Sequence, residues 1–160
     1  KVLGNRDTRK LGVAIAKLEF IDELPAASLD FWDWESENDK IFQWSTGESY
    51  RRIPLGKGKL TFFIRAAHPS IYEEPITVTI FLNCALRKEV VLSDNKWHKV
   101  QMDPGELPLD SLPEWDRSLR DELTGILCVR VSRTWKPSDY AENEDSRDLG
   151  VAVSKVTVSE

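Results

Sequence analysis

The chain has 160 residues and a formal net charge of −5, with 41% hydrophobic and 31% charged residues. This length is typical of about one domain, which buries roughly 70% of its unfolded surface, so folding requires no disulfide or cofactor. The negative charge, with no Lys/Arg cluster interleaved with aromatics, excludes nucleic acid as an expected partner. Apolar runs such as 76–82 fall far short of the ~20 residues that span a bilayer, so we expect no membrane contact by this segment.

The first predicted element is a strand over 12–20, and it belongs to a repeat. Residues 7–18 return in similar form as residues 145–156, an offset of 145 − 7 = 138. In each copy an Asp and an Arg predict a turn held by an ion pair and by carboxylate bonds to backbone amides, and Gly12 or Gly150 allows a close backbone approach. We therefore divide the chain into an N-terminal strand, 1–20, and a β-sandwich module, 21–160. The first part is either the closing strand of a preceding unit or a strand beside the final one.

Period-two alternation of apolar and polar residues dominates the rest of the chain. Strands are expected over 41–46, 48–53, 60–65, 76–82, 86–92, 97–102, 125–132 and 150–159. Turn residues separate them, for example Thr46-Gly47 and Ser93-Asp94-Asn95. Asp110 as a cap, with Pro113 in the first turn, predicts one short helix that continues to Leu123. About eight short strands without alternating helices predict an all-β fold, an antiparallel β-sandwich or jelly roll.

The residues that support metal or catalytic chemistry are few. Cys84 and Cys128 lie in strand-like runs and are expected to be buried free thiols, which favours a reducing compartment. His68 and His98 lie in no nucleophile motif, and no zinc spacing is present. We therefore expect no catalytic residue, no metal and no cofactor. Two alternatives stay open: calcium binding by the oxygen-rich loop 142–148, and glycoside hydrolysis by paired carboxylates among Asp33, Glu35 and Glu37, which lie near aromatic residues.

Six tryptophans are more than a core of this size needs. Trp44 alternates with Phe42 and is expected in the core, whereas Trp34 and Trp135 stand among charged neighbours. Flat aromatic faces stack on the apolar faces of sugar rings, while adjacent carboxylate and guanidinium groups bind the hydroxyls. The candidate ligand-binding residues are therefore Trp34, Glu35, Arg133 and Trp135.

Several motifs in consistent order resemble a family of noncatalytic β-sandwich modules. These modules are attached to bacterial envelope-polysaccharide proteins, including glycosyltransferases and O-antigen ligase or polymerase-like proteins. The motifs are Trp34-Glu35, Phe42-Gln43-Trp44-Ser45-Thr46-Gly47, Arg65-Ala66-Ala67-His68-Pro69, Val131-Ser132-Arg133-Thr134-Trp135-Lys136-Pro137 and Asp145-Ser146-Arg147-Asp148-Leu149-Gly150-Val151. Gln43 stands where the family pattern has an arginine.

The resemblance implies a jelly-roll, galactose-binding-like module without enzymatic activity, within a larger protein that is itself a glycosyltransferase or polymerase. Its expected partners are carbohydrate and the other domains of that protein. The resemblance and the free thiols together predict a cytoplasmic location, with membrane association only through the parent protein. The alternative is a structural β-sandwich that packs against a catalytic domain or a sister module and binds no sugar.

Overall fold

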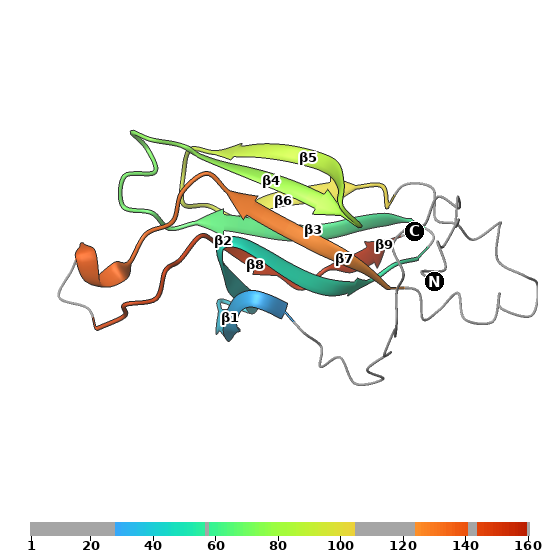
Figure 1. The fold of residues 1–160 in the computed structure, drawn as a ribbon, viewed down its shortest axis with the longest axis horizontal. Coiled ribbons are helices and arrows are strands. Elements are labelled where there is room, and N and C mark those ends of the chain that lie inside the picture. The colour runs from blue at the N-terminus through green and yellow to red at the C-terminus, as the bar shows by residue number, and fades with distance from the viewer. Residues whose placement is uncertain (1–27, 57, 105–123, 141–143, 160) are drawn as a thin grey trace, which may run out of the picture.

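The computed structural model describes residues 28–56, 58–104, 124–140 and 144–159, and these form a curled antiparallel β-sheet (Figure 1). The all-β prediction is confirmed. The expected strand 12–20, the expected helix near 110–123 and Trp115 lie outside the described residues. The strands are β1 (Ser28–Glu37), β2 (Lys40–Pro54), β3 (Lys59–Ala66), β4 (Ile76–Leu82), β5 (Ala85–Leu92), β6 (His98–Met102), β7 (Thr124–Val131), β8 (Val151–Ser154) and β9 (Thr157–Ser159).

The described strands follow the order β5-β4-β7-β2-β8-β3-β6, with β1 paired to β2 and β9 paired to β3. The long strand β2 joins the two halves of this order, because residues 42–44 pair with β8 and residues 48–54 pair with β7. Between β7 and β8 the chain leaves the sheet, forms the 3-10 turn η3 (Pro137–Asp139), and extends beyond one end of the strands (left in Figure 1). It returns through a bridge between Trp135 and Leu149.

One hydrophobic core lies on the inner face of the curled sheet. Alternate residues of β3 and β4 point into it, as the period-two pattern predicts, and Phe62, Ile64, Val78 and Ile80 are each at most 1% exposed. Strands β6, β7 and β8 add residues to the same cluster. Burial of a large apolar side chain contributes about 1.5–3 kcal/mol, so this core is the main source of stability among the described residues.

A second, aromatic cluster lies apart from that core. Its buried members are Phe42 and Trp44 of β2, Leu149, and Ala152 of β8. Trp32, Trp97 and Trp135 pack against it from β1, from the residue before β6 and from the segment after β7. The expected burial of Trp44 is therefore confirmed, and four of the six tryptophans have a packing role.

Two predicted strand boundaries are wrong. Thr46-Gly47 was expected as a turn, but β2 runs through it. The residues before it in the chain pair with β8, and the residues after it pair with β7. The Ser49 hydroxyl accepts the Thr46 N–H at 2.9 Å, which satisfies the backbone where the partner changes.

The expected strand 150–159 is instead β8 followed by β9. Val153 pairs with Ile64 of β3, and Thr157 pairs with Thr61, so three residues lie between these pairs in the C-terminal segment and two lie between them in β3. This is a bulge, and the Ser154 hydroxyl accepts the Phe63 N–H there at 2.9 Å. The bulge places Lys155 in the connection between the two strands.

Strand β1 was not predicted from the sequence. The predicted burial of Cys84 is wrong. Cys128 is buried, but Cys84 is exposed. Asn83 and Cys84 have φ of 51° and 64° and form the two-residue turn between β4 and β5. Both residues are in the left-handed region, as in a type I′ hairpin turn, so Cys84 leaves the strand face that its spacing from Leu82 suggested.

Candidate functional site

Trp34 is the most exposed tryptophan among the residues that the structure describes. It lies on β1 opposite Gln43 of β2, and 47% of its surface is accessible. Two cations approach its ring: Arg51 Cζ is 5.2 Å and Lys155 Nζ is 5.7 Å from the ring centroid. An exposed aromatic surface is thus combined with two positive charges.

Arg51 is the buried member of this group, with 5% of its surface exposed. It stands opposite Leu127 in the β2–β7 pairing, and directly opposed residues share a face, so Arg51 points toward the hydrophobic inner side of the sheet. Burial lowers the pKa of its guanidinium to about 10, which leaves it charged at neutral pH.

The partners that the structure describes for Arg51 are all uncharged. Its Nη1 donates to Gln43 Oε1 at 3.3 Å and its Nη2 donates to the Ser154 carbonyl at 2.7 Å. The rings of Phe31 and Trp34 each lie 5.2 Å from Arg51 Cζ. Among the residues in the described ranges, no carboxylate forms an ion pair with it. A buried charge is usually paired, because its desolvation is costly, so this arrangement is unusual.

Lys155 supplies the exposed cation. It follows the last residue of β8, in the bulge, and its backbone N–H donates to the Ile41 carbonyl at 3.4 Å. This bond fixes the backbone beside β2, while the side chain remains exposed. Its ammonium group has three N–H donors and is carried on a flexible aliphatic stem, so it can reach a ligand near Trp34.

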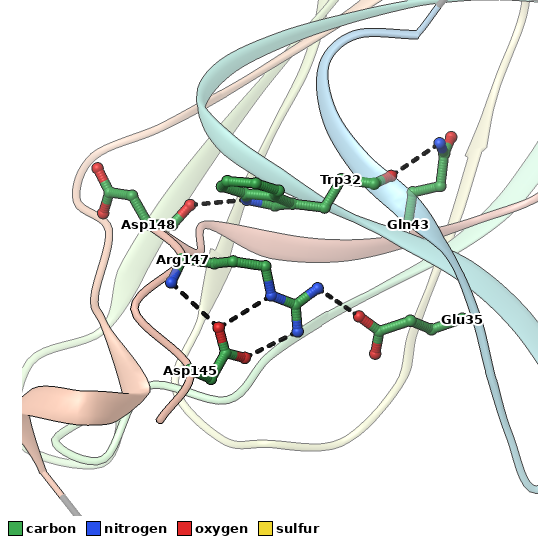
Figure 2. Close-up of polar contacts among 6 residues, drawn as sticks. All are labelled: Trp32, Glu35, Gln43, Asp145, Arg147 and Asp148. Carbon is green, nitrogen blue, oxygen red and sulfur yellow. Dashed lines mark hydrogen bonds and ion pairs between the residues drawn. The ribbon is translucent and has the colours of Figure 1, made fainter. Parts of the chain in front are cut away.

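Glu35 belongs to a different group of contacts, although it follows Trp34 directly. Figure 2 shows Arg147 between two carboxylates: its Nη1 lies 2.6 Å from Glu35 Oε1 and its Nη2 lies 2.8 Å from Asp145 Oδ2. The Arg147 backbone N–H and Nε also donate to Asp145 Oδ1, at 3.0 and 2.9 Å. The predicted turn held by Asp145 and Arg147 is thereby confirmed. The Arg147 side chain bonds hold the pKa of Asp145 below its usual value.

The same group fixes Trp32. Its Nε1 donates to the Asp148 carbonyl at 3.1 Å, and its own carbonyl accepts Gln43 Nε2 at 2.9 Å (Figure 2). Arg147 Cζ lies 5.8 Å from the Trp32 ring centroid. These contacts tie the segment before β8 to β1 and β2, which is a structural role.

Arg133 and Trp135 lie together in the segment that follows β7. Arg133 Nη1 is 2.6 Å from Glu74 Oε2 and 3.1 Å from Ser70 Oγ, and its Nη2 donates to the Glu74 carbonyl. The Trp135 ring centroid is 6.1 Å from that of His68 and 6.1 Å from that of Tyr140. His68 is itself buried, and its pKa is lowered by burial and by the charge of Arg133. Trp135 is partly buried in the aromatic cluster.

The four predicted ligand-binding residues therefore fall into three sets of contacts. Glu35 and Arg133 are each held by an oppositely charged partner, and Trp135 is packed against other rings. Trp34 alone of the four is an exposed residue, with just under half of its surface accessible. Arg51 and Lys155 were missed by the sequence reasoning. One signal in the sequence could have indicated Arg51. In the period-two alternation of β2 it shares the inward-facing positions with Ser49 and Ile53, where a charged residue is unusual.

No family model matches the chain, and no curated protein matches it. None of the described helical segments is long and apolar enough to cross a membrane. No cluster of three or more His, Cys, Asp or Glu side chains in the described ranges is placed to hold a metal ion. Part of the candidate calcium loop, residues 142–143, lies outside those ranges, and Asp145 within it binds Arg147.

Proposed function

We propose that this chain is a noncatalytic carbohydrate-binding module of bacterial cell-surface polysaccharide biosynthesis, with a sandwich or jelly-roll architecture. The observation that carries the proposal is the exposed ring of Trp34 beside the donors of Lys155 and Arg51. A sugar ring presents C–H groups that pack on an indole face, and its hydroxyls accept bonds from neighbouring cations. The motif resemblance supports the biological setting.

In this proposal Trp34 is the stacking residue, and Glu35 acts through Arg147 to position the segment before β8. Arg133 and Trp135 do not contact this sugar: Trp135 packs against His68 and the aromatic cluster, and Arg133 binds Glu74. The two free thiols, of which Cys84 is exposed, favour a cytoplasmic location for the module and its parent protein.

The direct test is to titrate bacterial envelope oligosaccharides into the wild type and into Trp34→Ala, and to measure binding by intrinsic fluorescence and by calorimetry. We expect saturable binding by the wild type and at least tenfold weaker binding by Trp34→Ala, as for loss of about 1.4 kcal/mol. Tyr72→Ala is the matched control, because Tyr72 is an aromatic residue with 67% of its surface exposed elsewhere on the chain. Equal binding by Trp34→Ala and wild type would refute the proposal.

One observation favours the alternative of a protein-packing module. Strand β5 ends the described sheet order, and it exposes Leu86 by 61% and Val91 by 59%. Exposed apolar side chains on an edge strand favour pairing with another chain. Light scattering over a concentration series tests this: association that Leu86→Lys abolishes supports it, and a monomer at every concentration counts against it.

A further inference from the structure

We infer that the sugar bound at Trp34 is acidic, and that Arg51 and Lys155 form a subsite for its carboxylate or phosphate group. This inference rests on the proposed function, because Trp34 is the shared stacking surface. It names the class of ligand, which the aromatic ring alone does not define.

The first argument is the charge of Arg51. Its guanidinium has five N–H groups, and its described hydrogen bonds go to one amide oxygen and one carbonyl. Dipoles and ring faces therefore surround the cation, and no carboxylate within the described residues neutralises its charge. An anion near the Trp34 ring would interact with this charge through a medium less polar than water, where attraction between charges is stronger.

The second argument is that two cations converge on one ring. Lys155 and Arg51 come from the β8–β9 bulge and from β2, and both lie within 6 Å of the Trp34 centroid. Lys155, like Arg51, has no ion pair with a carboxylate in the described part of the chain. By contrast, the partly buried arginines Arg65, Arg133 and Arg147 each form an ion pair.

The division of roles follows from burial. Lys155 is exposed and flexible, so it contacts the acidic group directly. Arg51 is held in place by Gln43 and Ser154, and it supplies a fixed positive charge next to the ring. The chain as a whole carries a net charge of −5, so this positive site selects an anion against the overall charge of the protein.

The test compares pairs of probes in which one member carries an acidic group and the other does not. Oligogalacturonate is compared with its carboxyl-reduced, neutral form, and galactose 1-phosphate is compared with galactose. We expect the acidic member of at least one pair to bind about tenfold tighter or more at low salt, an advantage that falls as ionic strength is raised. The two pairs distinguish a sugar carboxylate from a sugar phosphate.

Three variants separate the inference from the proposed function. Lys155→Gln should weaken binding of the acidic probe by about three- to tenfold and binding of the neutral probe by less, because glutamine keeps N–H donors for hydroxyls but loses the charge. Arg51→Met should likewise weaken the acidic probe more than the neutral probe, and Trp34→Ala should weaken both probes equally. Lys99→Gln on β6 makes the same change of charge at another exposed lysine and is the control.

A second readout needs no sugar. Iodide and caesium are fluorescence quenchers of opposite charge. Subtracting the fluorescence of Trp34→Phe from that of the wild type isolates the signal of Trp34. We expect iodide to quench this signal more strongly than caesium, and Lys155→Gln to reduce the preference. Trp34-dependent binding with equal affinity for acidic and neutral probes would overturn the inference alone. Absence of binding to every probe would overturn the proposed function.

Discussion

Gly150 occupies a position where the fold leaves no space for a side chain. A Cβ there would lie 2.5 Å from the Thr46 carbonyl oxygen, 2.6 Å from Ser45 Oγ and 3.1 Å from Val131 Cγ2. The nearest atom belongs to the backbone of β2, whose place is fixed by the Gly150 N–H bond to the Ser45 carbonyl at 2.7 Å. The close approach predicted from the Asp-x-Arg-x-Leu-Gly motif is therefore confirmed.

Replacement of Gly150 by alanine should lower the free energy of unfolding by about 1–3 kcal/mol, the usual cost of overpacking. Gly47→Ala is the matched control, because a Cβ at Gly47 meets only Thr134 Cγ2, at 3.9 Å. Urea denaturation of both variants measures the difference. Equal midpoints for the two variants would show that β2 and the start of β8 move apart easily.

The ion pair of Asp145 and Arg147 makes stability depend on pH. Hydrogen bonds from Arg147 lower the pKa of Asp145 in the folded state below its value of 3.8. The folded state then binds fewer protons than the unfolded state as pH falls, so the stabilisation present above pH ~4 is lost on acidification.

Asp145→Asn should cost up to about 1 kcal/mol at pH 7, because the pair is partly exposed to solvent. The difference from wild type should shrink as the pH is lowered through the pKa of the folded-state carboxyl. Asp148→Asn removes the same charge at an exposed side chain and should change little at any pH. The measurement is the urea midpoint of all three proteins between pH 2.5 and 7.

At the scale of elements, the turn between β4 and β5 carries a cysteine where backbone conformation favours glycine. Cys84 has φ of 64°, and Asn83 before it has φ of 51°. The turn is anchored because Asn83 Oδ1 accepts the Ile126 N–H of β7 at 2.8 Å. Asn-Gly is the preferred pair in a type I′ turn.

Cys84→Gly should therefore raise the free energy of unfolding by about 0.5–1 kcal/mol, and Cys84→Val should lower it, because a β-branched residue is strained at positive φ. Thermal unfolding under reducing conditions measures both. A destabilised glycine variant would mean that the Cys84 side chain makes a contact more valuable than the backbone strain that it causes.

The sequence predicts those elements in which one face alone is buried. Alternation in β3 and β4 gives both the strands and the inward residues, because half-buried strands have a strict period of two. It fails where tertiary partners decide. Gly47 is a turn residue by composition, yet β2 continues through it because β7 and β8 pair on either side. The bulge at Lys155 is likewise a matter of register with β3.

The candidate site was predicted only in part, for a related reason. Trp34 was selected by its charged neighbours in sequence, Asp33 and Glu35, but its neighbours in space are Arg51 and Lys155. These residues lie 17 and 121 positions along the chain from Trp34 (51 − 34 and 155 − 34). Pairing of β1 with β2, and of β2 with β8, brings them together, and no local pattern contains that information.

At the scale of the whole molecule, the two hydrophobic clusters share strands. Phe42 and Trp44 of β2 and Ala152 of β8 belong to the aromatic cluster, while Ile53 of β2 and Val153 of β8 belong to the inner core. If β2 or β8 separates from its neighbouring strands, the residues that it contributes to both clusters lose their packing at the same time. The described sheet should therefore unfold as one cooperative unit.

Phe62→Ala in the inner core and Trp44→Ala in the aromatic cluster test this cooperativity. Each should lower the free energy of unfolding by about 3–5 kcal/mol, and Val91→Ala on exposed β5 should change it little. In both core variants, tryptophan fluorescence, which reports mainly on the aromatic cluster, should change at the same urea concentration as the far-ultraviolet signal of the sheet. Separate transitions in Trp44→Ala would mean that the aromatic cluster opens while the inner core stays folded. Coincident transitions would mean that ligand binding at Trp34, which is joined to both clusters through β1 and β2, stabilises the whole described sheet against unfolding.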